Sequence, residues 1–252
     1  RLASGPNLAT RLLDHCGATI INSMKTADCH AYVLSESSLF VFKQRLILIT
    51  CGNCPLVKCA LALIEKFGNH QIVQLVFQRQ PERQPQRQIT QFQQDEQLLA
   101  QRLSNNQYQQ AIPLMFHYQD ATQASVTTQP QPCYRLQLQQ LSGAAFTAIQ
   151  GQDYSADQLQ FSLGLSQWAQ RYQINDWVFE PIGYSANGLA GDHYFTLHLS
   201  PEATYSLLSV ETNDAQLFQH LTAHLQGLFS PEQCLIVSAP PTNSLIKSDA
   251  HT

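Results

Sequence analysis

The chain has 252 residues, of which 44% are hydrophobic and 13% are charged, and its formal net charge at pH 7 is −4. This length suits one large domain or two small ones, and the weak charge without a basic cluster argues against nucleic-acid or acidic-membrane partners. No apolar run approaches the roughly 18 residues of a membrane-spanning helix. Seven cysteines and no secretory leader pattern indicate reduced thiols in a cytoplasmic protein.

The first 50 residues favour β-structure. Strands are expected at 17–22, 31–42 and 45–50, with a tight polar turn at 43–45 joining the last two. Four polar residues, 35–38, interrupt the longest of these apolar runs. Small and acidic residues are poor strand formers, so the plain interpretation is an edge or bulge that faces water.

A helix is expected next. It would begin near Asn53-Cys54-Pro55 and end at Gly68, because proline suits the first turn and glycine suits the position after the last. A strand follows at 71–77. Residues 78–97 are rich in glutamine and read as a solvated loop, and a short helix is expected at 95–103.

The rest of the chain alternates strands and helices. The expected strands are 111–118, 133–141, 176–180, 193–199, 204–211 and 234–239. The expected helices are 156–167, capped by Ser155, and 214–228. The stretch GYSANGLAGD reads as a loop, and the tail at 241–252 as frayed. Strand pairs followed by helices predict an α+β protein with antiparallel sheets and helices on their outer faces.

The interruption at 35–38 has a second interpretation, a self-cleaving peptide bond. A serine hydroxyl can attack the preceding carbonyl and exchange the amide for an ester, provided that the backbone is strained and the geometry is fixed. A base can then remove the α-proton of that serine. Elimination and hydrolysis leave a pyruvoyl group, whose ketone is an electron sink for amino-acid chemistry.

Cys51 and Cys54 form a CxxC pair. A zinc site would need four ligands, and no second CxxC or paired histidine lies at a useful spacing. Cys51 is also a candidate for a reactive thiol, because it lies at a strand end next to a helix N-terminus that would lower its pKa. An inert buried thiol is the alternative.

Of the nine histidines, His198 is the most informative. It lies in HYFTLHLSPE, where alternation places Phe195, Leu197 and Leu199 on one strand face and His198 on the other. A strand histidine that faces a polar interior can act as a base. A structural histidine with satisfied hydrogen bonds is the alternative.

Five stretches, YVLSESS, TCG, FEPIGYSANG, TLHLSPE and SVETN, together resemble eukaryotic-type S-adenosylmethionine decarboxylase in order and spacing. The resemblance runs from about Leu13 to the strand near 239 and is weak in the glutamine-rich middle. That family is a pyruvoyl enzyme made as a proenzyme. The resemblance implies a four-layer αββα sandwich of two antiparallel sheets with helices on the outer faces, formed by one domain over 1–252.

The resemblance also assigns the processing site. The cut would fall between Glu36 and Ser37, giving chains 1–36 and 37–252, and Ser37 would become the pyruvoyl group. The cofactor is therefore made from the chain itself, and no metal is implied.

Three further residues match the catalytic positions of the family. Ser185 matches the serine that supports ester formation, and His198 matches the base that drives elimination. Cys51 matches the cysteine that returns a proton to the substrate carbon after carbon dioxide leaves.

The implied substrate is S-adenosylmethionine, whose amine forms a Schiff base with the pyruvoyl ketone. Its decarboxylated product is the aminopropyl donor for spermidine and spermine. Phe179 matches an aromatic residue that stacks on adenine, and Glu202 matches the carboxylate that binds the ribose. Leu34 and Glu36 would flank the substrate pocket.

The sequence departs from the family in two places. The N-terminal Phe-Glu-Gly segment is not found in RLASGPNLATRLLDHCG, and the acidic cluster through which some members bind putrescine is replaced by glutamine and arginine. Ile49 stands where those members have lysine, although Glu211 is retained. Arg135 is a candidate for the missing positive charge, so activation by putrescine is not expected. The family precedent is a homodimer.

Two other functions remain open. The first is a diverged pyruvoyl decarboxylase that acts on another amino acid, such as ornithine or arginine. The second is a non-catalytic homologue that regulates a partner. Retention of Ser37, Cys51, Ser185 and His198 favours an active enzyme, and retention of the nucleoside-binding pair favours S-adenosylmethionine.

Overall fold

The chain was analysed as a computed structural model, which describes residues 6–35, 37–50, 54–80, 86, 88–103, 106–109, 114–120, 132–151, 154–202 and 205–239. It divides into two compact units. The first comprises Arg1–Ala3, Ile20–Leu48 and Gln129–Thr252, and the second comprises Ser4–Thr19 and Ile49–Thr128. The expected frayed tail lies outside the described residues.

The first unit is built on two antiparallel sheets. A four-stranded sheet has the order β1-β2-β3-β4, with bounds Ile20–Lys25, Cys29–Leu34, Ser37–Phe42 and Leu46–Thr50. A six-stranded sheet has the order β13-β8-β12-β11-β10-β9. Its strands are β8 (Cys133–Gln139), β9 (Gln173–Val178), β10 (Tyr184–Ala190), β11 (His193–Pro201), β12 (Ser206–Thr212) and β13 (Gln233–Ala239).

The sequence predicted that the polar residues 35–38 interrupt a single strand. In the structure this stretch instead lies where β2 ends and β3 begins. Leu34 at the end of β2 pairs with Ser37 at the start of β3, so the chain reverses direction between them. Ser35 is exposed in this turn. A hairpin therefore explains why residues with low strand propensity occur here, since a short turn between two strands favours polar residues.

The stretch GYSANGLAGD was also predicted wrongly, because most of it forms the interior strand β10 rather than a loop. β10 pairs with β9 on one side and β11 on the other. Its small residues are required by packing: a Cβ at Gly188 would lie 1.9 Å from Cε1 of Phe195. Composition alone indicates a loop here, and only the neighbouring strand explains the glycine.

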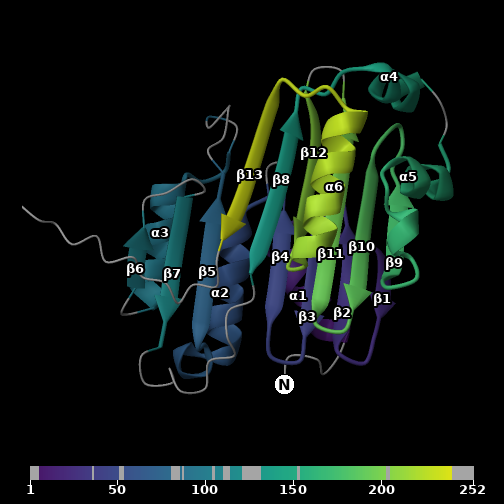
Figure 1. Ribbon diagram of the computed structural model, residues 1–252. Coiled ribbons are helices and arrows are strands. Elements are labelled where there is room, and N and C mark those ends of the chain that lie inside the picture. The colour runs from purple at the N-terminus through teal and green to yellow at the C-terminus, as the bar shows by residue number, and fades with distance from the viewer. Residues whose placement is uncertain are drawn as a thin grey trace, which may run out of the picture. The chain divides into compact units, whose positions relative to one another are not determined.

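The two sheets of the first unit pack face to face. The Phe40 ring in β3 lies 5.0 Å from the Tyr194 ring in β11, measured between centroids. Asn22 in β1 donates a hydrogen bond to the backbone oxygen of Asp176 in β9. The opposite face of the six-stranded sheet carries helices α4 (Ala144–Gly151), α5 (Ala156–Ser162) and α6 (Ala215–Leu228), and Figure 1 shows α6 lying along its strands.

Local sequence explains where two of these helices begin. The Ser155 hydroxyl accepts a hydrogen bond from the backbone N–H of Gln158 and caps α5, as predicted. Asp214 caps α6 by accepting from the backbone N–H groups of Gln216 and Leu217. Tyr172 donates a third bond to the same carboxylate at 2.7 Å, which ties α6 to the chain before β9. A short 3₁₀ helix, η4 (Ser166–Trp168), lies between α5 and β9.

The second unit contains helices α1 (Pro6–Asp14), α2 (Leu56–Phe67) and α3 (Phe92–Arg102), a short 3₁₀ helix η1 (Asn69–Gln71), and a three-stranded antiparallel sheet of order β5-β7-β6. The strands are β5 (Gln74–Arg79), β6 (Asn106–Gln109) and β7 (Leu114–Gln119). Helix α2 ends before Gly68, as predicted. Apolar residues of α2, α3, β5 and β7 form its core.

The architecture confirms the predicted α+β class, in which antiparallel sheets carry helices on an outer face. The resemblance implies two antiparallel sheets, whereas the described residues form three, with four, six and three strands. Helices α1 and α4 were missed because both are short, with nine and eight residues. Among the described residues, no helix combines the length and hydropathy needed to cross a bilayer.

Candidate active site

One face of β10 and β11 carries a row of polar side chains. Ser185 pairs across the strands with His198, and Asn187 pairs with Thr196. Because side chains alternate along a strand, these four residues share one face. Phe195 and Leu197 belong to the apolar core on the opposite face, as the sequence predicted. The polar face is the one that packs against β2 and β3.

His198 is partly buried and uses both ring nitrogens. Its Nδ1 lies 2.7 Å from the Ser185 hydroxyl, and its Nε2 lies 2.8 Å from the Thr196 hydroxyl. The surrounding protein removes water from the ring and lowers the pKa of His198 to about 4. The imidazole is therefore neutral at pH 7, with one nitrogen available to accept a proton.

Ser38 joins the network from β3. Its hydroxyl donates to Oδ1 of Asn187 at 2.6 Å and lies 2.9 Å from the Thr196 hydroxyl and 3.2 Å from Nε2 of His198. Asn187 in turn donates to the backbone oxygen of Tyr32 at 2.9 Å. Ser38, Asn187 and Thr196 were not predicted as site residues. The sequence signal for Asn187 and Thr196 is that polar side chains recur at every second position of β10 and β11.

Ser37 differs sharply from its neighbour. Its hydroxyl is buried and has no hydrogen-bond partner among the described residues. Its φ is 151°, a backbone conformation that residues with a side chain rarely adopt. Such strain persists only where the surrounding structure enforces it, and here Ser37 begins β3 and pairs with Leu34 of β2.

Phe179 and Glu202 lie at one end of the strands of the six-stranded sheet. Phe179 directly follows β9 and Glu202 directly follows β11, and both strands run antiparallel to β10. The C-terminal ends of β9 and β11 therefore lie at the same end of the sheet, next to Ser185 near the start of β10. Glu202 is exposed and Phe179 is partly exposed. Trp177 pairs with Ser185, shares its face and is 44% exposed, so it adds an aromatic surface that was not predicted.

The other predicted site residues are less informative. The Leu34 side chain is fully buried at the end of β2, where Leu34 pairs with Ser37. Glu36 and Cys51 lie outside the described residues, and Cys51 directly follows β4 in sequence. Their predicted roles are untested.

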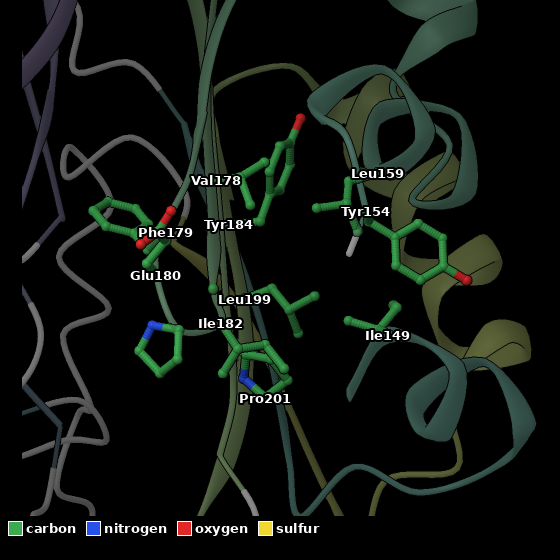
Figure 2. Close-up of a pocket in the computed structure, with 12 residues that line it drawn as sticks. Ile149, Tyr154, Leu159, Val178, Phe179, Glu180, Ile182, Tyr184, Leu199 and Pro201 are labelled. Carbon is green, nitrogen blue, oxygen red and sulfur yellow. The ribbon is translucent and has the colours of Figure 1, made fainter. Parts of the chain in front are cut away.

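A cavity of about 290 Å³ lies at the same end of the sheet, on its opposite face. Figure 2 shows Ile149, Tyr154 and Leu159 on one side of the strands and Phe179 with Glu180 on the other. Val178 and Tyr184 point toward the helices, whereas Trp177 and Ser185 alternate with them and point away. Most of its lining residues are apolar and lie on the helix-covered face, whereas the His198–Ser185 network lies on the opposite face.

A second polar cluster lies further along the inner strands. Arg135 in β8 forms an ion pair with Glu211 in β12, and Tyr194 donates to the same carboxylate at 3.0 Å. Burial and the Glu211 charge raise the pKa of Tyr194 well above its usual range. Arg135, the sequence candidate for a positive charge in this region, thus lies against the Glu211 carboxylate.

The fold of the chain is α+β, and its first unit contains two sheets packed face to face. It is similar to the crystal structure of the Trypanosoma brucei AdoMetDC-delta26 monomer, with a TM-score of 0.61, 20% identity, and coverage of 79% of this chain and 78% of that one. The adenosylmethionine decarboxylase family matches residues 6–248, and the chain belongs to that family.

Two relatives named S-adenosylmethionine decarboxylase proenzyme show the extent of the similarity. The protein of Dictyostelium discoideum is 26% identical over 231 residues, which cover 87% of this chain and 61% of the relative. The protein of Drosophila melanogaster is 27% identical over 250 residues, which cover 89% of this chain and 72% of the relative. The chain thus spans about 61% of the length of the first of these relatives.

Proposed function

We propose that the chain is an S-adenosylmethionine decarboxylase that is made as a precursor and cleaves itself between Glu36 and Ser37. The observation that carries the proposal is the position of a strained serine with an unpartnered hydroxyl beside the Ser38–His198–Ser185 network. The residues present fit a pyruvoyl group, because that group is made from a serine in such an environment.

The cleavage needs a nucleophile and a base. The Ser37 hydroxyl attacks the carbonyl carbon of Glu36, so that the peptide bond is replaced by an ester and the amine of residue 37 is released. Neutral His198 then accepts the α-proton of residue 37, and the ester C–O bond breaks. The resulting dehydroalanine takes up water and loses ammonia. Ser185 holds His198 through Nδ1 and thereby leaves Nε2 directed toward β3.

Two adjacent serines compete for the role of nucleophile. Ser38 is the one that contacts His198, but its hydroxyl is also committed to Asn187 and Thr196. The Ser37 hydroxyl makes no such bonds, and attack would relieve its backbone strain. This difference favours Ser37 as the reacting residue and Ser38 as a positioning residue.

Intact mass measurement of purified chains tests the cleavage. The wild-type 252-residue chain is expected to give fragments of 36 and 216 residues. Ser37→Ala is expected to stay whole, whereas Ser38→Ala should still be cut before Ser37, more slowly. Fragments that begin at residue 38, or a Ser37→Ala chain that is cut normally, would assign the reaction to Ser38.

The proposed substrate is S-adenosylmethionine. When present, the pyruvoyl group supplies the electron sink for loss of the carboxylate. Phe179 would stack on the adenine, Glu202 would accept hydrogen bonds from the ribose hydroxyls, and Leu34 and Glu36 would flank the pocket. Both Phe179 and Glu202 lie at the end of the sheet where β10 begins, near Ser185, which supports this assignment. Cys51 would return a proton to the substrate carbon.

Release of labelled carbon dioxide tests the substrate. Processed enzyme is expected to act on S-adenosylmethionine and not on ornithine or arginine. Glu202→Gln should raise KM for S-adenosylmethionine more than it lowers kcat, because it removes a binding contact remote from the reacting carbon. Turnover of ornithine or arginine with no response to Glu202→Gln would favour the diverged decarboxylase. Processed chain that releases carbon dioxide from none of them would favour a non-catalytic homologue.

Three further properties are part of the proposal. The enzyme would act in the cytoplasm as a homodimer and provide the aminopropyl donor for spermidine and spermine. Putrescine would not activate it, because the Arg135–Glu211 pair already supplies a positive charge at the buried acid. A clear rate increase with millimolar putrescine would contradict this last expectation.

A further inference from the structure

Three cysteines of the second unit meet where α1 ends and α2 begins. Cys16 follows α1, Cys54 precedes α2, and Cys59 lies in the first turns of α2. The Cys54 thiol donates a hydrogen bond to the backbone oxygen of Cys16 at 3.2 Å, and the Cys59 thiol donates to the backbone oxygen of Leu12 at 3.2 Å. All three are reduced in the structure. The cluster belongs to the second unit, whereas β10 and β11 belong to the first.

Cys16 is the centre of this cluster. The pKa of the Cys16 thiol is lowered well below its usual range, chiefly by the neighbouring Cys54 and Cys59 side chains. Burial and the neighbouring negative sulfur raise the pKa of Cys59. These shifts concentrate thiolate character on Cys16, whereas the Cys54 and Cys59 thiols donate to backbone oxygens.

The three sulfurs differ in their access to solvent. Cys16 is 4% exposed and Cys59 is 1% exposed, whereas Cys54 is only partly buried. A small oxidant therefore reaches the cluster through Cys54. Cys54 also lies just before the N-terminus of α2, where the helix dipole favours negative charge on sulfur.

We propose that Cys16 and Cys54 form a modification site for peroxides, at which oxidation ends in a disulfide between them. Hydrogen peroxide oxidises the Cys54 thiol to a sulfenic acid and is reduced to one water molecule. The Cys16 thiolate attacks the Cys54 sulfur, the S–O bond breaks, and the departing hydroxide takes the proton that Cys16 had lost. Two thiols thereby give up two electrons and two protons, and the peroxide becomes two water molecules.

Other uses of the cluster are less consistent with its geometry. Among the described residues, no group of three or more cysteine, histidine or acidic side chains is arranged to hold a metal ion. The remaining competitor is a bridge between Cys54 and Cys51 of the CxxC pair. The contact of Cys54 with Cys16 favours Cys16 as the partner.

Peptide mapping distinguishes the possible bridges. After treatment of the full chain with equimolar hydrogen peroxide and alkylation, trypsin is expected to leave peptide 12–25 joined to peptide 46–58 through Cys16 and Cys54. Cys16→Ser and Cys54→Ser should each abolish the joined peptide. Cys234→Ser is the matched control, because that cysteine is exposed and remote in sequence, and it should leave the bridge unchanged.

Three results would overturn the proposal. They are a bridge within peptide 46–58, a bridge from 12–25 to peptide 59–66, and oxidation that is confined to Cys234.

Discussion

The two faces of β10 and β11 are both largely buried, yet they are chemically opposite. The helix-covered face carries Phe195 and Leu197 within a continuous apolar core. The face toward β2 and β3 carries Ser185 and His198 in a hydrogen-bonded network. Apolar residues stabilise a fold wherever they are packed, whereas buried polar groups do so only when each finds a partner.

The comparison explains how one pair of strands serves the fold and the chemistry. On the polar face every hydroxyl of the network is bonded, and the unpartnered hydroxyl belongs to Ser37 beside it. The apolar face fixes the strands, and the polar face aims the imidazole. Substitutions on the two faces are therefore expected to have separable effects, the first on stability and the second on self-cleavage.

The largest expected effect follows from removing the base. His198→Gln keeps a polar side chain of similar size but cannot accept the α-proton, so self-cleavage should slow by about 10²–10⁴-fold. The rate is measured by following the uncut chain on denaturing gels. His15→Gln, at an exposed position, should cleave like wild type. Equal rates for both variants would remove His198 from the chemistry.

The apolar face gives the next effect. Leu197→Ala removes a fully buried side chain and is expected to lower the free energy of unfolding by about 2–5 kcal/mol. Denaturant titration measures this change. The fraction that remains folded should still cleave at the wild-type rate, and Leu98→Ala at a 38% exposed position should cost much less. Loss of cleavage without loss of stability would contradict the separation of the two faces.

Protonation of His198 gives a pH-dependent effect. The folded protein lowers its pKa from 6.5 to about 4, so between these values the unfolded chain binds more protons than the folded one. Stability should therefore be complete above pH 6.5 and decrease by up to about 3 kcal/mol as the pH falls through 4. Unfolding titrations of wild type and His198→Gln, compared at pH 7 and pH 4, measure the difference.

His198→Gln should lack this part of the pH dependence, because glutamine does not titrate. The same linkage predicts that the cleavage rate of wild type is nearly constant from pH 8 to pH 5 and falls below that range. A rate that falls between pH 7 and pH 6 would indicate an ordinary, solvated histidine.

The smallest expected effect concerns the support of the network. Asn187→Ala removes the bonds to Ser38 and to the Tyr32 carbonyl, so the free energy of unfolding should fall by about 1–3 kcal/mol. Thermal unfolding measures it, with exposed Gln219→Ala as the neutral control. Cleavage of the folded protein should slow only modestly, since His198 keeps its bonds to Ser185 and Thr196. A complete block would make Asn187 part of the reacting group.

The sequence predicted the fold class and the orientation of His198, because strand alternation is a local property. It did not predict that GYSANGLAGD forms a strand, since the glycine requirement at 188 comes from Phe195 on the next strand. The turn after Leu34 was missed for a similar reason: pairing of β2 with β3 is not visible in a continuous run of residues. Asn187 and Thr196 had a sequence signal in the alternation of polar side chains, whereas the contact of Ser38 with them became visible only when two sheets came together.

The central claim is that the bond before Ser37 breaks and leaves a keto group, and exact mass of the larger fragment tests it most directly. For wild-type protein we expect a fragment that begins at residue 37 and is lighter, by one ammonia molecule, than the same fragment with a serine terminus. A chain that stays whole under native conditions, or a larger fragment that keeps an ordinary serine at its terminus, would contradict the account.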